Sequence, residues 1–266
     1  MRVVALLAAY NEERFIATCI EHLRSQAVDT YLIDNESTDE TVAIASRYLN
    51  RGLIGIETVP RKGIYSWKPI LRRKEELACE LDADWFMHVD ADEIRLPPDP
   101  VCMLADAFVE VAEQGYNAVN FFEYTFVPTK EDPDHDHADF QRTMRWYYPF
   151  SPKHPHQLKA WRNTEQCVDL VSSAGHAVSF PGLRMRPDSF PMRHYLFLSV
   201  PHAHAKYVSR VYDPAEVAEG WHRRRAAVQA GSINLPTRSE LRCYVSDALL
   251  DPSEPLGHHP SLGAPV

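Results

Sequence analysis

The sequence predicts an α/β fold with a mostly parallel sheet covered by helices on both faces. Short apolar runs alternate with segments of helical periodicity across residues 3–89. The runs are continuously apolar, as in strands that are buried on both faces, and do not alternate between apolar and polar residues. Three of the runs end in acidic segments, so the polar residues gather where strands finish.

The first half alternates strand and helix. The spacing of Ile16, Cys19, Ile20 and Leu23 predicts a helix over 14–26. Ser37 and Glu40 have the spacing of a capping box, with Ser37 as the cap of a helix that carries Val42 to Tyr48. The strands are expected at 3–8, 30–33, 53–59 and 85–89, and a third helix at 66–81.

The second half is expected to be less regular, because the chain has twenty prolines against ten glycines and most prolines follow Leu96. A helix is expected at 101–114, a long strand at 117–126 and a polar loop at 128–139. Strands at 143–148 and 157–161 are expected to pair with each other, followed by a short strand at 177–180. Helices are expected at 196–211, 214–230 and 237–249, and the tail from Asp251 is expected to be disordered.

Composition excludes several classes of protein. The net charge of −9 and pI of about 5.8 argue against a nucleic-acid partner. The chain lacks a run of about 18 apolar residues, so no transmembrane segment is expected, and its first residues are interpreted as a strand, not a signal peptide. Five scattered cysteines without a C-x-x-C spacing favour a reducing compartment, and we expect a cytoplasmic location.

The acidic segments are the candidate site. Asn11-Glu12-Glu13 follows the first strand, Asp34 to Asp39 follows the second, and Asp90-Ala91-Asp92 follows the fourth. The carboxyl ends of parallel strands share one edge of a sheet, which is where such folds bind ligands. Asp90 and Asp92, two residues apart, would repel each other without a cation between them, and their oxygens suit Mg²⁺ or Mn²⁺.

In this order and spacing, the three segments resemble the signature of family 2 glycosyltransferases with the GT-A fold. The resemblance covers about the first hundred residues, with Ala8-Ala9 where the family usually has a proline before the first motif. It implies a Rossmann-like sheet followed by an irregular α+β half on the acceptor side. It implies one domain over 1–250, with a nucleotide-sugar-binding half at 1–115, an acceptor or lid half at 116–250 and the tail at 251–266.

The resemblance also implies site residues. Glu12 and Asp34 would bind the nucleoside, while Asp90 and Asp92 would meet the ribose and a metal ion on the diphosphate. Asp92 is expected to be the direct metal ligand, Asp90 the partner of the ribose or of a metal-bound water, and Glu93 is expected to face away. The residues expected at the nucleotide-sugar site are Ala9, Tyr10, Glu12, Asp34, Glu36, Asp90, Ala91 and Asp92.

The implied reaction is transfer of a sugar, by inversion in the family default, from a UDP- or GDP-sugar to a hydroxyl of a glycan or small-molecule acceptor. Charge develops on the leaving diphosphate, which Mn²⁺ or Mg²⁺ would stabilise. Basic residues could assist, or could be surface charges: Arg61, Lys62, Arg72 and Lys74 in the first half, and Lys206, Arg210 and Arg223 to Arg225 as a possible lid.

Two further roles are proposed from the second half. Pro191-Met192-Arg193-His194-Tyr195 is similar to the element in which several GT-A enzymes carry a late metal-binding histidine, so His194 is a candidate ligand, the alternative being an ordinary satisfied histidine. The transfer needs a base for the acceptor hydroxyl. Asp169 is preferred and His176 comes second; the other candidates are Glu123, Glu165 and Asp188.

Two other functions remain open on the sequence. A nucleotidyltransferase could use a similar sheet, but usually has a basic, glycine-rich loop after its first strand, and Ala8 to Glu12 lacks one. A non-catalytic module that binds a nucleotide-sugar or a glycan would need no base.

Overall fold

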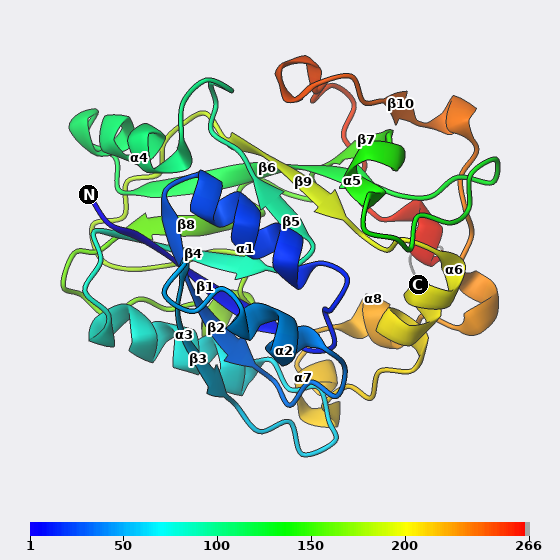
Figure 1. The fold of residues 1–266 in the computed structure, drawn as a ribbon, viewed down its shortest axis with the longest axis horizontal. Helices are drawn as coiled ribbons and strands as arrows, with labels where there is room; N and C mark the ends of the chain where they lie inside the picture. The colour runs from blue at the N-terminus through cyan, green and yellow to red at the C-terminus, as the bar shows by residue number, and fades with distance from the viewer. Residues whose placement is uncertain (264–266) are drawn as a thin grey trace. The chain divides into compact units, whose positions relative to one another are not determined.

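A computed structural model describes residues 1–263 of the 266-residue chain (Figure 1). These residues form two compact units, each built from separate segments of the chain. The first unit comprises 1–60, 67–122 and 155–192, and the second comprises 61–66, 123–154 and 193–263. The boundaries between the units include two that fall inside strands, β6 (Ala118–Phe126) and β9 (Phe190–Tyr195).

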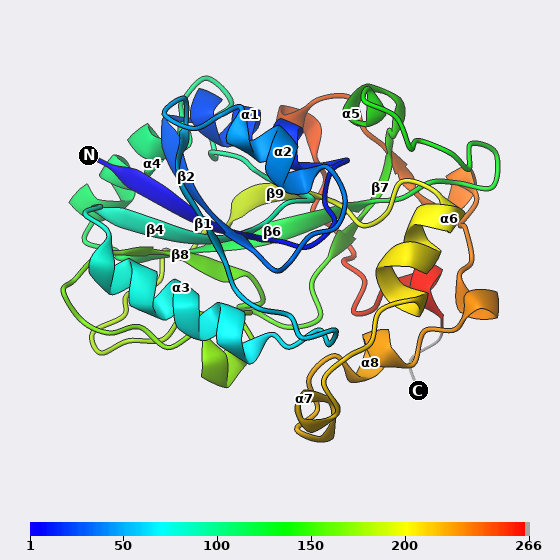
Figure 2. The ribbon, with the colours of Figure 1, turned by 60° about the horizontal axis from the view of Figure 1, so that its bottom comes forward.

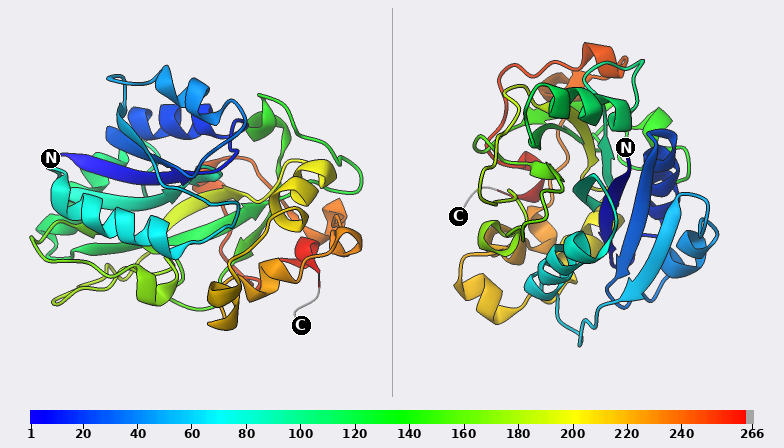
Figure 3. Two further views of the ribbon diagram at one scale, coloured as in Figure 1. Left: turned by 90° about the horizontal axis from the view of Figure 1, so that it is seen from below. Right: turned by 90° about the vertical axis from the view of Figure 1, so that its left-hand side faces the viewer.

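The first unit has an α/β fold with a mixed sheet whose central strands are parallel, as predicted. Strand order in this unit is β6-β8-β4-β1-β2-β3, in which β1 to β4 are parallel and β8 is antiparallel to both β4 and β6. Helices α1 and α2 lie on one face and α3 lies on the other (Figure 2). Figure 3 shows the same helices, in blue and cyan, on the two sides of the strands from two further directions. The elements are β1 Val3–Ala9, α1 Ile16–Ser25, β2 Val28–Asp34, α2 Thr41–Ser46, β3 Leu53–Thr58, α3 Lys68–Glu80, β4 Trp85–Asp90, β5 Glu93–Arg95, α4 Leu104–Glu113 and β8 Leu158–Arg162.

Burial explains why these segments form a sheet. Every residue of β1 is buried, as expected for a strand with helices on both faces. The ring of Trp85 at the start of β4 stacks on Phe108 of α4 at 4.7 Å between centroids, which anchors that helix.

The second unit is less regular. The last residues of β6 pair with β7 (Trp146–Phe150), and β7 pairs with β10 (Arg242–Cys243), both antiparallel. Its helices are single turns or little more: α5 Phe140–Thr143, α6 Val200–Ala203, α7 Pro214–Ala218 and α8 Arg223–Ala226. In Figure 1, α5 is green, and α6, α7 and α8 run from yellow to orange.

Two local predictions were wrong. The hydroxyl of Ser37 accepts from the backbone N–H of Asn11 at 3.0 Å and caps no helix; α2 begins at Thr41, whose N–H donates to Asp39 Oδ1 at 2.9 Å. Strands β7 and β8 do not pair with each other, because each pairs with a different part of β6.

The predicted helices of the second half are interrupted. The segment 196–211 forms α6 and then a π-helical turn over His204–Val208. The segment 214–230 breaks at Gly220 and His222, both of which have positive φ. The segment 237–249 contains two 3₁₀ turns and β10, because Arg242 pairs with β7 and Arg145 binds the carbonyl of Tyr244.

The segment after Asp251 has defined contacts, where the sequence predicts disorder. The N–H of Leu256 donates to the Pro149 carbonyl at 2.9 Å, and the N–H of Ser151 donates to the Leu256 carbonyl at 3.0 Å. The Arg242 guanidinium donates to the carbonyls of Asp251 and Ser253. These contacts hold the segment beside β7; the last three residues of the predicted tail, 264–266, lie outside the described residues.

Candidate active site

The three acidic segments meet at one edge of the first unit. Ala9 is in register with Asp34 on the neighbouring strand, and Ala8 is in register with Asp90 on the other side. The loops after β1 and β2 are tied together, since Thr38 N–H donates to Asn11 Oδ1 at 2.8 Å and Glu12 N–H donates to Thr41 Oγ1 at 2.7 Å. The expected residues Ala9, Tyr10, Glu12, Asp34, Glu36, Asp90, Ala91 and Asp92 all lie on these strand ends or the loops that follow them.

Asp34 is held by its own turn. Its side chain is buried, and both carboxylate oxygens accept from the N–H of Ser37 at 3.2 Å. Glu36, two residues later, has φ of +59°, the left-handed conformation that lets the chain turn back toward the β1 loop.

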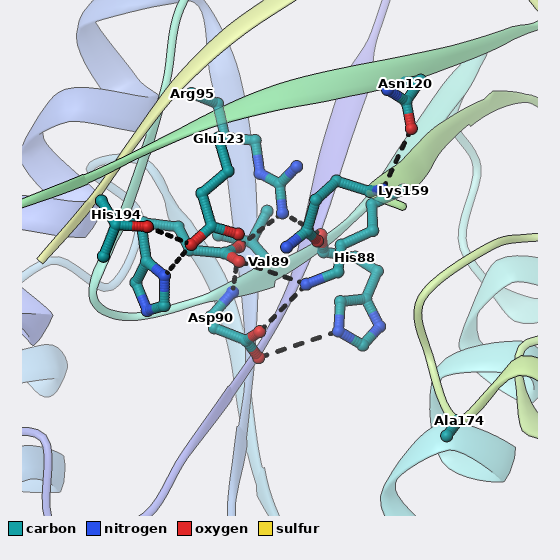
Figure 4. A network of polar contacts seen from close by, with 12 residues as sticks. His88, Val89, Asp90, Arg95, Asn120, Glu123, Lys159, Ala174 and His194 are labelled. Carbon is teal, nitrogen blue, oxygen red and sulfur yellow. Dashed lines mark hydrogen bonds and ion pairs between the residues drawn. The ribbon is translucent and has the colours of Figure 1, made fainter. Parts of the chain in front are cut away.

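Asp90 forms an ion pair with a lysine on the neighbouring strand. Its Oδ2 lies 3.1 Å from Lys159 Nζ, on the adjacent strand β8, and its side chain is one-third exposed (Figure 4). Burial raises the pKa of Asp90, but Lys159, His88 and Lys74 together outweigh this effect and hold that pKa well below its usual value. Asp90 is therefore charged at neutral pH before any ligand binds.

Glu93 faces inward, in contrast to the expectation. Its Oε1 accepts from Lys159 Nζ at 3.2 Å, and its Oε2 accepts from Arg95. Glu93, Arg95 and Lys159 are all buried, and the Arg95 guanidinium also lies 4.2 Å from the centre of the Phe121 ring. Burial lowers the pKa of Lys159, yet Asp90 and Glu93 raise it above its ordinary value, so the network is an internal set of ion pairs.

Lys74 lies beneath the same strand and not at the surface. It is fully buried, and Nζ donates to the carbonyl of Val89 at 3.3 Å, with the Trp67 ring 5.7 Å away. Burial lowers its pKa to about 7, despite the opposing effect of Asp90. His88 is also buried, and burial together with Lys74 and Lys159 lowers its pKa well below the usual value, so its imidazole is neutral.

The two candidate bases lie in one turn of the first unit, residues 169–176. Asp169 Oδ1 accepts from Ser172 N–H at 2.9 Å, and the His176 ring stacks on His156 at 4.9 Å between centroids. The turn is fastened to α3: Glu75 Oε1 accepts from two backbone N–H groups, of Leu170 and Val171, and Trp67 Nε1 donates to the Ala174 carbonyl. It is a fixed element of the unit.

Arg61 and His194 belong to the second unit. The guanidinium carbons of Arg61 and Arg210 lie 5.7 and 4.5 Å from the centre of the Tyr65 ring. His194 is buried, and its Nδ1 lies 2.7 Å from Glu123 Oε1.

The residue types at the strand ends fit a divalent metal bound together with a diphosphate. Across residues 1–263 no group of three His, Cys, Asp or Glu side chains is arranged around a common point. Mg²⁺ needs no such cage, since it is usually bound by one or two carboxylates together with substrate phosphates. Asp92, which is largely buried, and Asp90, which is partly exposed, provide two such carboxylates.

Sequence reasoning missed Lys159, Arg95 and the inward position of Glu93. One signal was available: Lys159 is a single charge in the middle of a strand-like run, Gln157-Leu158-Lys159-Ala160-Trp161. A charge in such a position needs a buried partner of opposite charge, and Glu93 was the one carboxylate of the segment Asp90 to Glu93 without a predicted ligand.

Comparison with known proteins identifies the family. The family model described as "Glycosyl transferase family 2" matches residues 5–159, more than half of the chain. The chain belongs to glycosyl transferase family 2. This family match includes all three acidic segments, so the resemblance drawn from them is confirmed, as is the predicted fold class.

Curated relatives share part of this family 2 chain. A lipopolysaccharide core biosynthesis glycosyltransferase LpsC of Rhizobium meliloti is 28% identical over 34% of this chain and 31% of its own length. A glucosyl-3-phosphoglycerate synthase of Petrotoga mobilis is 29% identical over 44% of this chain and 37% of its own. The matched segments thus span about a third of each relative.

Similar solved structures include S. aureus TarS 1-349 in complex with UDP, with a TM-score of 0.46 at 14% identity over 85% of this chain and 72% of that one. Glucosyl-3-phosphoglycerate synthase from Mycobacterium tuberculosis, solved with Mn²⁺, UDP and phosphoglyceric acid, gives a TM-score of 0.31 at 22% identity over 46% and 43% of the two chains. None of the helices in residues 1–263 is both long and apolar enough to cross a membrane.

Proposed function

We propose that this family 2 chain transfers a sugar from a nucleotide-diphospho-sugar, a UDP- or GDP-sugar, to a hydroxyl group of a glycan or small-molecule acceptor, with inversion. The observation that carries the proposal is the register of Ala9, Asp34 and Asp90, which gathers the three acidic segments at one sheet edge. The names of the two curated relatives, a glycosyltransferase and a glucosyl-3-phosphoglycerate synthase, agree with it.

In the proposed mechanism, Glu12 and Asp34 bind the nucleoside, and Asp90 binds the ribose. Asp92, with Asp90 and His194 as further candidates, would hold Mn²⁺ or Mg²⁺, and the ion when bound supplies positive charge next to the leaving diphosphate. Lys159 keeps Asp90 ionised and in place through its 3.1 Å contact. Because Lys74 is buried, its proposed effect on the site is through Val89 and Asp90, whereas Arg61 remains a candidate for direct phosphate binding.

Asp169 is the proposed base and His176 the alternative. The attachment of their turn to α3 supports either role, because a base must be held in position to remove a proton. We also propose a cytoplasmic location, since the five cysteines are unpaired thiols.

The test is thermal unfolding with UDP, GDP and their sugars, each with and without Mn²⁺. We expect one diphosphate to stabilise the chain only when the metal is present, by about 2.7 kcal/mol at a hundred times its Kd. The effect should disappear in Asp92→Asn and persist in Asp106→Asn, a control on the exposed face of α4.

Two results would contradict the proposal. Equal stabilisation by the nucleotide with and without Mn²⁺ would contradict the proposed metal dependence. The absence of stabilisation by any of the nucleotides would contradict the proposed donor site. Slow metal-dependent release of free sugar from the stabilising donor would separate an enzyme from a non-catalytic binding module, which would bind the donor without breaking it.

A further inference from the structure

Two exposed cysteines of the first unit lie next to each other, although they are far apart in the sequence. Cys79 is in the last turn of α3, and Cys167 lies in the segment between β8 and the turn of 169–176. Both are free thiols at the surface, and a side-chain hydrogen bond joins them. The fold therefore brings two accessible thiol groups into contact.

One side of this pair is fixed by a carboxylate of the same helix. Glu75 lies one helical turn before Cys79, so the two side chains are on the same face of α3. The N–H groups of Leu170 and Val171 both donate to Glu75 Oε1, at 2.6 and 3.0 Å. Leu170 follows Cys167 closely in the sequence. The helix face that carries Cys79 thus holds the chain just after Cys167.

The other side of the pair is fixed by the chain that follows α3. Asn163 N–H donates to the Asp84 carbonyl at 2.8 Å, and its Nδ2 donates to the Ala83 carbonyl at 3.0 Å. These contacts hold the chain before Cys167 against the chain after Cys79. The two segments run in opposite directions between these attachment points, so each thiol lies between two anchors and its contact with the other thiol follows from the fold.

This arrangement favours a disulfide formed by exchange with a small-molecule disulfide, such as oxidised glutathione. One protein thiolate attacks the small disulfide, forms a mixed disulfide and releases one small thiol. The other protein thiolate then attacks the mixed disulfide, forms the protein S–S bond and releases the second small thiol. The two protein thiols lose two protons and two electrons, which the small disulfide gains. Because the second attack is intramolecular, contact between the thiols favours it.

We propose that Cys79 and Cys167, held together by the contacts of Glu75, are a thiol modification site that a small-molecule disulfide converts reversibly to an intramolecular disulfide. In a reducing compartment the pair is present as two thiols, and it is oxidised when small disulfides accumulate. Burial and the Cys167 thiol raise the pKa of Cys79, so that thiol is mostly protonated at neutral pH and the exchange is slow. The oxidation is therefore measured at equilibrium.

The new bond would act on the turn of 169–176. An S–S bond of about 2.05 Å is shorter than a hydrogen-bonded contact between two sulfur atoms, so its formation draws Cys167 toward α3. Asp169 is two residues further along the chain. The consequence for catalysis rests on the base role proposed above for Asp169, because a displacement of about 1 Å at a reacting group can lower a rate about 100-fold.

The first experiment locates the bond in the unaltered chain. The reduced protein is equilibrated with oxidised and reduced glutathione, free thiols are alkylated, and tryptic peptides are analysed by mass spectrometry without reduction. Trypsin places the two cysteines on separate peptides, 75–95 and 163–184, which we expect to be joined. Cys243→Ser, which removes another exposed thiol, should leave this product unchanged. Glutathione bound separately to Cys79 and Cys167, or a bond from either to another cysteine, would overturn the proposal.

The second experiment tests what holds the pair together. Glu75→Ala removes the acceptor of two N–H groups and should lower the equilibrium constant for disulfide formation about tenfold or more, the equivalent of one charge-assisted hydrogen bond. Glu76→Ala removes the next carboxylate, which pairs with Arg73, and should change the constant by less than about threefold. Equal effects of the two changes would show that Glu75 does not position the thiols.

A third measurement separates this proposal from the proposed function. The oxidised chain should release sugar from the donor at least about tenfold more slowly than the reduced chain, and a small-molecule thiol should restore the rate. The chain with both Cys79→Ser and Cys167→Ser should not respond to glutathione. If the disulfide forms without a change in rate, the effect on Asp169 is wrong while the modification site stands. If the reduced chain releases no sugar, the proposed transfer is wrong, and the peptide analysis alone decides whether the disulfide forms.

Discussion

Glu93 in the first unit and Glu123 in the second are both buried carboxylates on strands, and their surroundings differ in kind. Glu93 is enclosed by two full cations, Lys159 and Arg95. Glu123 has an imidazole and a hydroxyl. The first arrangement brings a carboxylate into contact with two basic side chains, whereas the second joins a carboxylate to an imidazole and a hydroxyl group. The charge of Glu93 is thus compensated by two basic side chains inside the first unit, while Glu123 is held by hydrogen-bonding groups of lower charge.

Removal of Lys159 should have the largest effect on stability. Lys159→Met leaves Glu93 and Asp90 without their shared ammonium, and breaking a buried ion pair from one side costs about 3 to 5 kcal/mol. Urea unfolding checks this, with the exposed Lys153→Met as the matched control. A loss below about 1 kcal/mol would mean that water, and not Lys159, compensates these carboxylates.

The lowered pKa of the buried Lys74 should make the free energy of unfolding depend on pH. Its pKa is lowered to about 7 in the folded chain and is about 10.5 when unfolded, so between these values the unfolded state binds more protons. Its contribution therefore becomes more unfavourable as pH falls from about 10.5 to 7, by at most about 1.4 kcal/mol per unit, and is constant below pH 7.

Lys74→Met removes this dependence. The stability gained by the variant should be greater at pH 7 than at pH 9 in denaturant unfolding at the two pH values. Equal differences at both pH values would show that the Lys74 ammonium stays protonated in the folded chain, held by Asp90.

We expect the smallest effect on stability from the loss of a neutral contact in the second unit. Tyr148 OH lies 2.8 Å from His259 Nδ1, and the His259 ring stacks on Phe150 at 4.0 Å. Tyr148→Phe removes this hydroxyl, together with its hydrogen bond to the Thr125 side chain, and should cost about 1 kcal/mol, measured by urea unfolding against Tyr116→Phe. If Tyr148→Phe lowers the free energy of unfolding as much as Lys159→Met does, the charged network of the first unit is no more important for stability than the neutral contacts of the second.

Local patterns predicted the first unit well and the second poorly. Strands such as Val3–Ala9 are short, apolar and locally defined, and the acidic segments that follow them identify the sheet edge. The predicted helix over 237–249 failed because its apolar spacing competes with contacts made far away in the sequence, such as Arg145 to Tyr244. Lys159 and Glu123 act through partners 66 to 71 residues away, which periodicity does not encode.

The position of Lys159 has a consequence for dissecting the chain. The family match ends at residue 159, inside β8, while the first unit continues to residue 192. A fragment cut where the sequence similarity stops would end at the buried Lys159, lose the last three of the five residues of β8, and lack the turn of 169–176 that is attached to α3. The evolutionary boundary and the folding boundary are therefore different places, and a shortened chain for study should keep residues 155–192 intact.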